Sequence, residues 1–398
     1  MRGLKTLRPR RTRGIGGGVK CLAAAALAVA TATAPLFQAA AMAQEAAPGR
    51  APARGDAPAR GKARLPGGIS ATPNQVRGDE INEAQRRAVE KGLGWLAARQ
   101  RSDGGFAGED GSGSGHAGIT ALAGLAFMQA GNLPGRGKYG KEVQKCLDYV
   151  MSCSQQSGLI TSDNSSGPMY GHGFATLFLG EIYGMTGNEE VKEKLQRAVM
   201  LIQKSQNAEG GWRYQPQPYD ADISVTICEV MALRAARDAG IKVEKEVIDK
   251  SIQYVKSCQN PDGGFSYQPS MRSMGSGYGR TAAGVASLYY AGVFEGGELE
   301  RGLSYLKRYM PGKGGGDAAT EGMYFYANYY AVQAMFLAGG DYWAEFYPAI
   351  RDDLVRRQSP TGSWSGEAGD DYGTALALII LQMPNRYLPV YNGKGPGA

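Results

Sequence analysis

The sequence predicts an all-α protein, a closed α6/α6 toroid (barrel) of six helix-pair repeats. A large apolar pair of residues recurs along the chain at intervals of 54, 52, 53, 51 and 48 residues. Each pair ends a charged amphipathic segment, and an uncharged segment rich in Ala, Gly and aromatic residues follows. Four of the six units also share the turn Gln-x3-Gly-[Gly or Ser]-[Phe or Trp]. A repeat of this length is typical of stacked helix pairs.

The apolar pairs mark the ends of six outer helices, whose charged faces we expect to be solvated. In the last pair the first member is polar. The pairs are Trp95-Leu96, Tyr149-Val150, Leu201-Ile202, Tyr254-Val255, Tyr305-Leu306 and Asp353-Leu354.

The uncharged segments predict six inner helices, because a helix that is apolar all round must be covered on every side. Gly or Asn closes most of them, as expected of a left-handed C-terminal residue. An open solenoid would need polar terminal caps, which the sequence lacks, so we expect the inner ring to close. The segments are residues 118–131, 173–187, 222–240, 279–292, 324–340 and 371–385.

The four shared turns join an outer helix to the next inner helix and begin at Gln100, Gln206, Gln259 and Gln358. A glutamine amide can satisfy carbonyl groups at one helix end and N–H groups at the next. The glycines permit a tight bend, and the aromatic ring covers the joint. We therefore interpret this motif as structural. The second and fifth units, at residues 154–163 and 309–318, have lost it.

The N-terminal part of the chain is expected to lie outside the toroid. Residues 1–43 combine a basic start, an apolar stretch and a small-x-small site at Ala41-Met42-Ala43, which predicts a signal peptide and export, periplasmic or secreted. Residues 44–78 are mostly Ala, Pro, Gly and Arg and predict a disordered tether. The toroid then covers residues 79–390, and residues 391–398 form a flexible tail.

The basic charge belongs to these N-terminal segments. Residues 1–78 hold 13 Lys and Arg against 2 Asp and Glu, whereas the rest of the chain holds 31 basic and 35 acidic residues. A mildly acidic body disfavours a nucleic-acid partner. No stretch after the signal reaches the roughly 18 apolar residues of a membrane span. The expected partner is an apolar small molecule or another protein.

The Gln-x3-Gly-Gly-[Phe or Trp] turn, preceded by an aromatic–aliphatic pair, resembles the repeat of the prenyltransferase and squalene-oxidase/terpene-cyclase superfamily over roughly residues 80–390. The resemblance implies an α/α toroid that processes isoprenoids in its central cavity. Class II cyclases of this kind carry Asp-x-Asp-Asp at the start of an inner helix, with the middle Asp as general acid. The matching residues are Asp220, Asp222 and Ile223, so the resemblance implies Asp222 as the acid beside Asp220. Ile223 departs from the pattern, and the Asp-x-Cys zinc motif of protein prenyltransferases is absent from the sequence.

Counting back fifteen residues from the closing residue of each inner helix yields equivalent positions that should circle one mouth of the cavity. Asp222 falls about three residues early in the third, longer helix. The ligand-binding candidates at these positions are His116, His172, Tyr324 and Asp370, with Gly277 in the fourth repeat. These side chains can cap helices, form a polar binding site, or hold a metal. Two His and a carboxylate suit zinc, at His116, His172 and Asp222.

Three functions remain open. The first is a terpene cyclase/prenyltransferase-like enzyme, an isomerase or transferase, acting on an isoprenoid or other apolar ligand. Tyrosine rings at or beside the inner helices could stabilise its carbocations. They belong to Tyr170, Tyr278, Tyr289, Tyr290, Tyr324, Tyr326, Tyr329, Tyr330 and Tyr372. The second is a non-catalytic exported toroid that binds a ligand or a protein. The third is a carbohydrate-active α6/α6 enzyme, with carboxylates drawn from Asp222, Glu367, Asp370 and Asp371.

Overall fold

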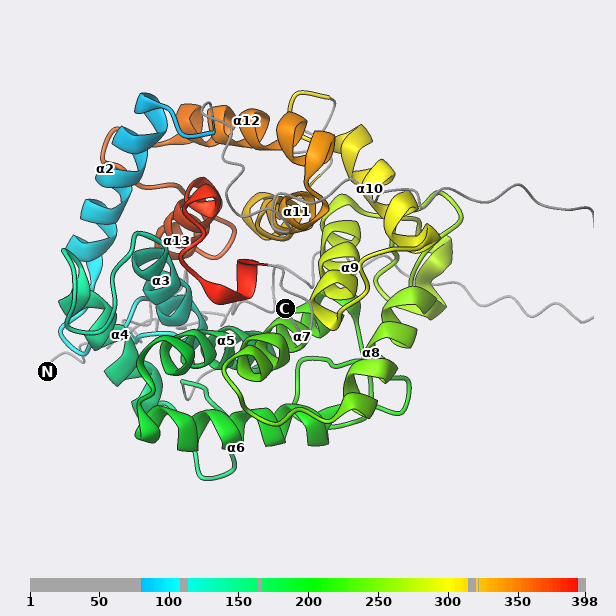
Figure 1. The fold of residues 1–398 in the computed structure, drawn as a ribbon, viewed down its shortest axis with the longest axis horizontal. Helices are drawn as coiled ribbons and strands as arrows, with labels where there is room; N and C mark the ends of the chain where they lie inside the picture. Colours follow the sequence, from blue (N-terminus) through cyan, green and yellow to red (C-terminus); the bar gives the residue numbers. More distant parts are fainter. Residues whose placement is uncertain (1–79, 108–113, 163–166, 314–319, 321, 393–398) are drawn as a thin grey trace, which may run out of the picture.

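The computed structural model describes residues 80–107, 114–162, 167–313, 320 and 322–392. Within them the chain forms twelve α-helices in two concentric rings, and β-structure is limited to isolated bridges (Figure 1). The outer helices are α2 (Glu83–Arg99), α4 (Gly140–Ser152), α6 (Glu189–Ser205), α8 (Lys245–Ser257), α10 (Gly297–Tyr309) and α12 (Gly340–Arg357). The inner helices are α3 (Ala117–Gln129), α5 (Met169–Thr186), α7 (Ile223–Asp238), α9 (Tyr278–Ala291), α11 (Tyr324–Ala338) and α13 (Asp370–Leu381). The predicted fold class is confirmed. The signal peptide and tether predicted at residues 1–78 lie outside the described residues.

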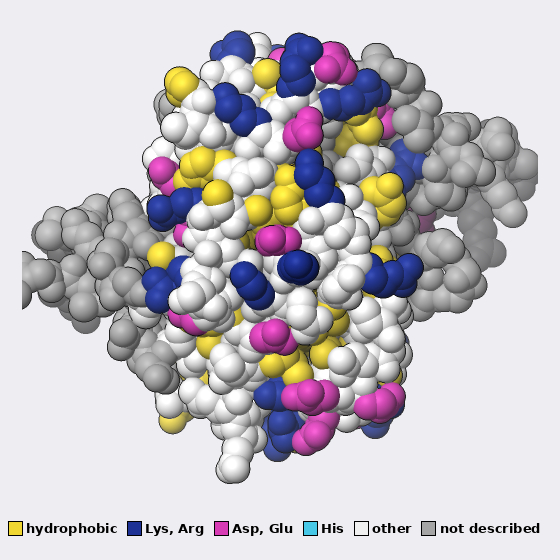
Figure 2. Space-filling model, turned by 90° about the vertical axis from the view of Figure 1, so that its left-hand side faces the viewer, with side chains coloured by type: hydrophobic (Ala, Val, Ile, Leu, Met, Phe, Trp, Pro, Cys, Tyr) yellow, Lys and Arg dark blue, Asp and Glu magenta, His cyan; other side chains and the backbone are white. Residues whose placement is uncertain are grey.

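The two rings differ in burial as the sequence pattern requires. Every residue of α3 is buried. In α10, by contrast, only Leu299, Gly302, Leu303, Tyr305 and Leu306 are buried, and acidic residues start the helix while basic residues end it. That order of charges favours the helix because it opposes the helix dipole. On the face that carries α2 and α4, acidic and basic side chains are interspersed (Figure 2). The described part of the chain holds no helix both long and apolar enough to cross a membrane.

The inner ring closes on itself. Each inner helix contacts the next, from α3 through α5, α7, α9 and α11 to α13, and α13 packs against α3 (Figure 1). The outer ring closes where α12 contacts α2. Because no repeat is left at an exposed end, the polar terminal caps of an open solenoid are unnecessary.

The turn glutamines connect neighbouring repeats. The side-chain amide of Gln206 donates to Gly210 O at 2.9 Å and to Val247 O in the next outer helix at 2.8 Å. Gln100, Gln259 and Gln358 make the same pair of bonds in their own repeats. We expected these glutamine side chains also to bind N–H groups of the inner helix. A different residue links the turn to that helix. A threonine one turn into that helix does so instead, as where Trp212 N donates to Thr226 Oγ1 at 3.1 Å.

The first glycine of each turn is required by a close approach to the next outer helix. Gly210 has φ +101°, and a Cβ there would lie 2.2 Å from Lys250 O. Gly158 in the second repeat has φ +94°, and its Cβ would lie 2.3 Å from Arg197 O. The second repeat therefore keeps the bend that the sequence analysis regarded as lost. It lacks the glutamine, the second glycine and the aromatic ring, whose positions Ser154, Leu159 and Ile160 take.

The C-terminal segment covers one end of the inner ring. It forms the 3-10 helices η3 (Met383–Asn385) and η4 (Pro389–Asn392), and η4 contacts α5 and α7 (red in Figure 1). Tyr391, assigned from sequence to the tail, is fully buried, and its hydroxyl lies 3.4 Å from Tyr329 Oη. Val390 N donates to Glu181 Oε1 of α5 at 3.2 Å. The packed body therefore includes Tyr391.

Candidate functional site

Aromatic rings occupy much of the axis of the inner ring. Tyr329 of α11 meets Phe174 of α5 edge to face, with 6.1 Å between ring centroids. Tyr330 of α11 places its hydroxyl 3.1 Å from Cys228 Sγ of α7. These contacts cross the ring between helices that are not sequential neighbours. The centre of the barrel is therefore packed, and a pocket lies toward one end of the inner ring.

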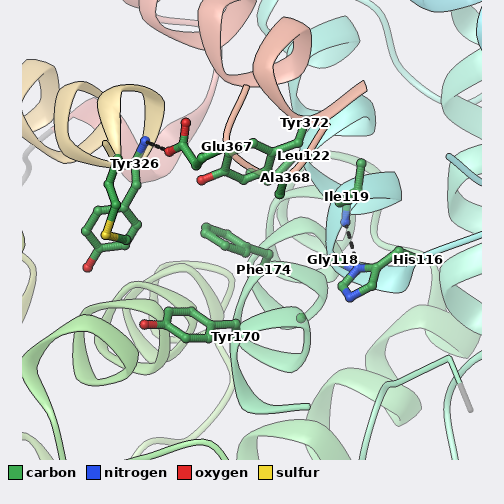
Figure 3. Close-up of a pocket in the computed structure, with 12 residues that line it drawn as sticks. His116, Gly118, Ile119, Leu122, Tyr170, Phe174, Tyr326, Glu367, Ala368 and Tyr372 are labelled. Carbon is green, nitrogen blue, oxygen red and sulfur yellow. Dashed lines mark hydrogen bonds between the residues drawn. The ribbon is translucent and has the colours of Figure 1, made fainter. Parts of the chain in front are cut away.

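That pocket lies at the amino-terminal ends of α3, α5 and α11 and under the turn before α13 (Figure 3). The space between atoms there is about 510 Å³, which includes open solvent at its mouth, and the centre of a water molecule can occupy about 30 Å³ of it. The lining is mainly apolar and aromatic, and within the described chain it includes two ionisable side chains other than tyrosines, His116 and Glu367. The lining residues are His116, Gly118, Ile119, Leu122, Tyr170, Gly171, Phe174, Met323, Tyr326, Glu367, Ala368 and Tyr372.

His116 is the N-cap residue of α3. Its Nδ1 accepts hydrogen bonds from Gly118 N at 3.2 Å and Ile119 N at 3.3 Å (Figure 3). Because Nδ1 is an acceptor, the neutral ring carries its proton on Nε2. Beside it, a Cβ on Gly118 would lie 2.7 Å from Gly171 Cα, so this glycine pair lets α3 and α5 approach closely at the pocket wall.

Glu367 caps a helix of the preceding repeat. Its carboxylate accepts hydrogen bonds from Tyr326 N at 2.8 Å and Phe325 N at 3.3 Å, at the start of α11 (Figure 3). The N-cap residue of α11 itself, Met323, makes no side-chain cap bond. Burial raises the pKa of Glu367, and these N–H donors and the Tyr372 hydroxyl oppose the rise. The pocket thus has one carboxylate in its wall.

Asp222 is the fully buried N-cap residue of α7. Its Oδ1 accepts hydrogen bonds from Ser224 N at 2.8 Å and Val225 N at 2.9 Å. Its Oδ2 makes no hydrogen bond of normal geometry with the described residues, and Arg213 Nε lies 3.8 Å away. Burial raises the pKa of Asp222 to about 6, although the capping N–H groups, the nearby Tyr267 hydroxyl and Arg213 lower it. Asp222 is not among the residues that line the pocket.

Asp220 lies at the surface beside Asp222 and has a different role. Its side chain is 50% exposed and forms an ion pair with Arg213. Gln268 Nε2 also donates to Asp220 Oδ1 at 3.0 Å. The guanidinium of Arg213 lies over the rings of Tyr214 and Tyr267, 5.2 and 5.9 Å from their centroids. Asp220 thus fixes the position of Arg213 next to the buried acid.

His172 is not equivalent to His116, contrary to the sequence alignment of the repeats. The longer helix α5 begins at Met169 after Pro168, so His172 lies one turn inside it. Counting back from the helix end misaligned the two histidines because α5 is longer than α3. His172 Nδ1 accepts a hydrogen bond from Ile160 N at 3.1 Å, the role that Thr226 plays in the third repeat. Burial lowers the pKa of His172 to about 4, which leaves the ring neutral.

Tyr324 and Asp370 do not line the pocket. The Tyr324 hydroxyl donates to Asp353 on α12, and the Arg357 guanidinium lies 4.1 Å from the centroid of its ring. Asp370 is exposed at the start of α13. The next residue, Asp371, is buried and accepts hydrogen bonds from residues of the first repeat. Of the four predicted ligand-binding residues, only His116 lines the pocket.

In the part of the chain that the structure describes, no group of three or more His, Cys, Asp or Glu side chains is placed to hold a metal ion. His116, His172 and Asp222 therefore do not assemble the zinc site that their residue types suggested.

Neither the pocket position of Phe174 nor the capping role of Glu367 was predicted from the sequence. Phe174 follows Tyr170 by four residues and therefore shares its helix face, a spacing that could have indicated it.

Comparison with known proteins identifies the family. The model of the prenyltransferase alpha-alpha toroid domain matches residues 76–187 and 138–315. Among curated proteins, no significant match to the sequence is found.

Several solved structures share the fold. The apo type II terpene cyclase MstE from Scytonema is 13% identical, with TM-score 0.55 over 77% of this chain and 99% of that one. The GH76A alpha-1,6-mannanase of Salegentibacter sp. HEL1_6 is 11% identical, with TM-score 0.56 over 75% and 98%. A protein from Actinoplanes is 16% identical, with TM-score 0.52 over 76% and 99%. At these identities the likeness is one of fold alone. The family match, by contrast, spans more than half of the chain, which belongs to the prenyltransferase alpha-alpha toroid domain family.

Proposed function

We propose that this protein binds an isoprenoid or a similarly apolar small molecule in the pocket at the amino-terminal ends of α3, α5 and α11. The observation that carries the proposal is the composition of the pocket wall, where Ile119, Leu122 and Phe174 face aromatic rings of α11 and α13. Burial of apolar ligand surface against such a wall contributes about 25 cal/mol per Å². Variants of the similar toroid MstE bind geranylgeranyl dihydroxybenzoate and merosterolic acid A, which supports an isoprenoid ligand.

The test is equilibrium binding of the C15 hydrocarbon β-farnesene to the full-length protein. Ala368 lines the pocket, so Ala368→Phe should fill it and abolish binding. Val89 lines a separate open groove on the outer surface, between α2 and the α3–α4 connection. Val89→Phe adds similar bulk there and should leave binding unchanged. Absence of binding to the unmodified protein, or equal binding by Ala368→Phe, would refute the pocket assignment.

A second candidate function is proton donation by Asp222 to a bound polyene, as the Asp-x-Asp motif implies. The favouring observation is that this carboxyl is fully buried with its pKa raised to about 6, so that part of it is protonated near neutral pH. The experiment is incubation with squalene and shorter polyprenyl substrates, followed by mass spectrometry of the products. Cyclised product that is lost in a folded Asp222→Asn variant supports the enzyme. Binding without product supports a non-catalytic toroid for a ligand or a protein.

Glycoside cleavage has less support. It requires two carboxyl groups on either side of the scissile bond. Among the described residues, Glu367 is the only acidic one that lines the pocket. Asp370 is exposed, and Asp371 joins the first and last repeats.

We also propose that the protein is exported, on the basis of the signal-like residues 1–43. Expression of the full chain followed by cell fractionation and N-terminal sequencing tests this. A mature N-terminus at Gln44 in the exported fraction is the expected result, and an intact cytoplasmic chain would contradict it.

A further inference from the structure

Three buried polar groups beside the pocket make no hydrogen bond of normal geometry with the described residues, although the Tyr267 hydroxyl lies near one of them, the Asp222 carboxylate. They are Tyr170 Oη, Asp222 Oδ2 and Arg213 Nε. Most buried polar groups in native proteins are paired with protein or water, because an unpaired one forfeits its hydration. An acceptor, a donor and a hydroxyl that can act as either are left unpaired in one region, which indicates a site for an additional polar group.

The three groups lie close together. Arg213 Nε is 3.8 Å from Asp222 Oδ2, too far for a hydrogen bond. The Tyr170 ring packs against Tyr214 at 6.1 Å, and Arg213 lies over that same Tyr214 ring. Burial raises the pKa of Tyr170, and the nearby charge of Asp222 raises it further.

Tyr170 connects this cluster to the apolar pocket. It lines the pocket, and its hydroxyl points to the same side as that of Tyr326, away from His116 (Figure 3). The Tyr326 hydroxyl lies 3.4 Å from Ser224 O, two residues after Asp222. Tyr170 and Tyr326 thus lie between the apolar pocket and the polar cluster at the start of α7.

We propose that the pocket takes an amphipathic ligand, whose hydrocarbon chain lies against Phe174 and whose single hydroxyl group binds between Arg213, Asp222 and Tyr170. This rests on the proposed function and specifies its ligand class. A hydroxyl oxygen can accept from Arg213 Nε while its proton is donated to Asp222 Oδ2, so one group satisfies both. A pure hydrocarbon leaves both unpaired. A diphosphate would place negative charge against Asp220 and Asp222, which a single arginine cannot offset.

The experiment compares three probes with the same C15 chain: farnesol, β-farnesene and farnesyl diphosphate. Their affinities for the full-length protein are measured by isothermal titration calorimetry. Farnesol should bind about tenfold more tightly than β-farnesene, since one added hydrogen-bonded group contributes roughly that factor. Farnesyl diphosphate should bind most weakly. Equal affinities for farnesol and β-farnesene would overturn this inference while leaving the proposed function intact. Such equality is expected if ordered water, and not a ligand hydroxyl, pairs with the cluster.

Variants locate the hydroxyl. Tyr170→Phe removes one oxygen and should weaken farnesol binding about five- to tenfold without changing β-farnesene binding, and Asp222→Asn should act in the same direction. Tyr278→Phe is the matched control, because Tyr278 at the start of α9 also has a buried, unpaired hydroxyl but does not line the pocket. An equal loss in Tyr278→Phe, or tightest binding of the diphosphate, would refute the assignment. If no probe binds, the proposed function itself fails.

Discussion

The side-chain amide of Gln358 donates to the carbonyl of Ala88 at 2.9 Å, across 270 positions in the sequence. The same amide donates to Gly362 O in its own turn, also at 2.9 Å. Gln206 bonds to its own turn and to the next outer helix in the same way. The junction between the last and first repeats is therefore chemically the same as an internal junction.

This equivalence predicts equal effects at the closing and internal junctions. Gln358→Ala and Gln206→Ala should each lower the free energy of unfolding by about 1–3 kcal/mol, because each removes two hydrogen bonds to backbone carbonyls. Urea denaturation measures both. A near-zero effect of Gln358→Ala beside a clear effect of Gln206→Ala would mean that the ring does not close as described.

The turn aromatic is expected to act on stability alone. Trp212 is buried, and its Nε1 donates to Ile202 O at 2.7 Å. Trp212→Ala should cost about 3–5 kcal/mol of stability through the cavity it leaves. Trp212→Phe should cost much less, because Phe106 and Phe265 fill the same position in other repeats. Thermal unfolding and β-farnesene binding are measured together. Altered binding in a variant of unchanged stability would show that the motif belongs to the binding site.

The turn glycine is expected to be less replaceable than a helix-ending glycine. Gly210→Ala combines a positive φ with a Cβ 2.2 Å from Lys250 O. Gly187→Ala is the matched control, since Gly187 also has a positive φ, +67°, but nothing lies within 4 Å of its Cβ. Gly187→Ala should cost about 1 kcal/mol from backbone strain, and Gly210→Ala should cost clearly more because a backbone carbonyl must move. Equal melting temperatures for the two variants would contradict this account.

Asp222 predicts a specific pH dependence of stability. Its pKa rises on folding from 3.8 to about 6, so between these pH values the folded state binds more protons and stability falls as pH rises. The loss amounts to about 3 kcal/mol and is complete above pH 6. Asp222→Asn removes this loss and keeps an oxygen that can cap the helix.

His172 has the opposite effect in an overlapping pH range. Its pKa falls on folding from 6.5 to about 4, so its contribution to stability rises with pH between these values. The measured quantity is therefore the difference in unfolding free energy between Asp222→Asn and the unmodified protein. This difference should increase in favour of the variant from pH 4 to pH 7. A constant difference would mean that the pKa of Asp222 is not raised.

The sequence by itself determined the number of repeats, the two classes of helix and the closure of the ring. These properties follow from local patterns. Helix α10 carries charged residues and α3 carries none, which indicates that α10 faces water and α3 does not. The turn residues also indicated where each outer helix ends. Asp222 was placed correctly at the start of α7 for the same reason, since N-cap signals depend on neighbouring residues.

Only the tertiary structure decided which side chains meet. Glu367 caps α11 from 41 residues away, and Arg213 faces Asp222 because a turn folds back beside the helix that it precedes. His172 was misplaced by one turn because α5, with 18 residues, extends further at its C-terminal end than α3, with 13 residues, so counting back from the helix end shifted the register. A repeat pattern fixes helix order, but the axial position of each helix depends on side-chain volumes across the ring. Those volumes also determine that tyrosines fill the centre and leave a pocket at one end.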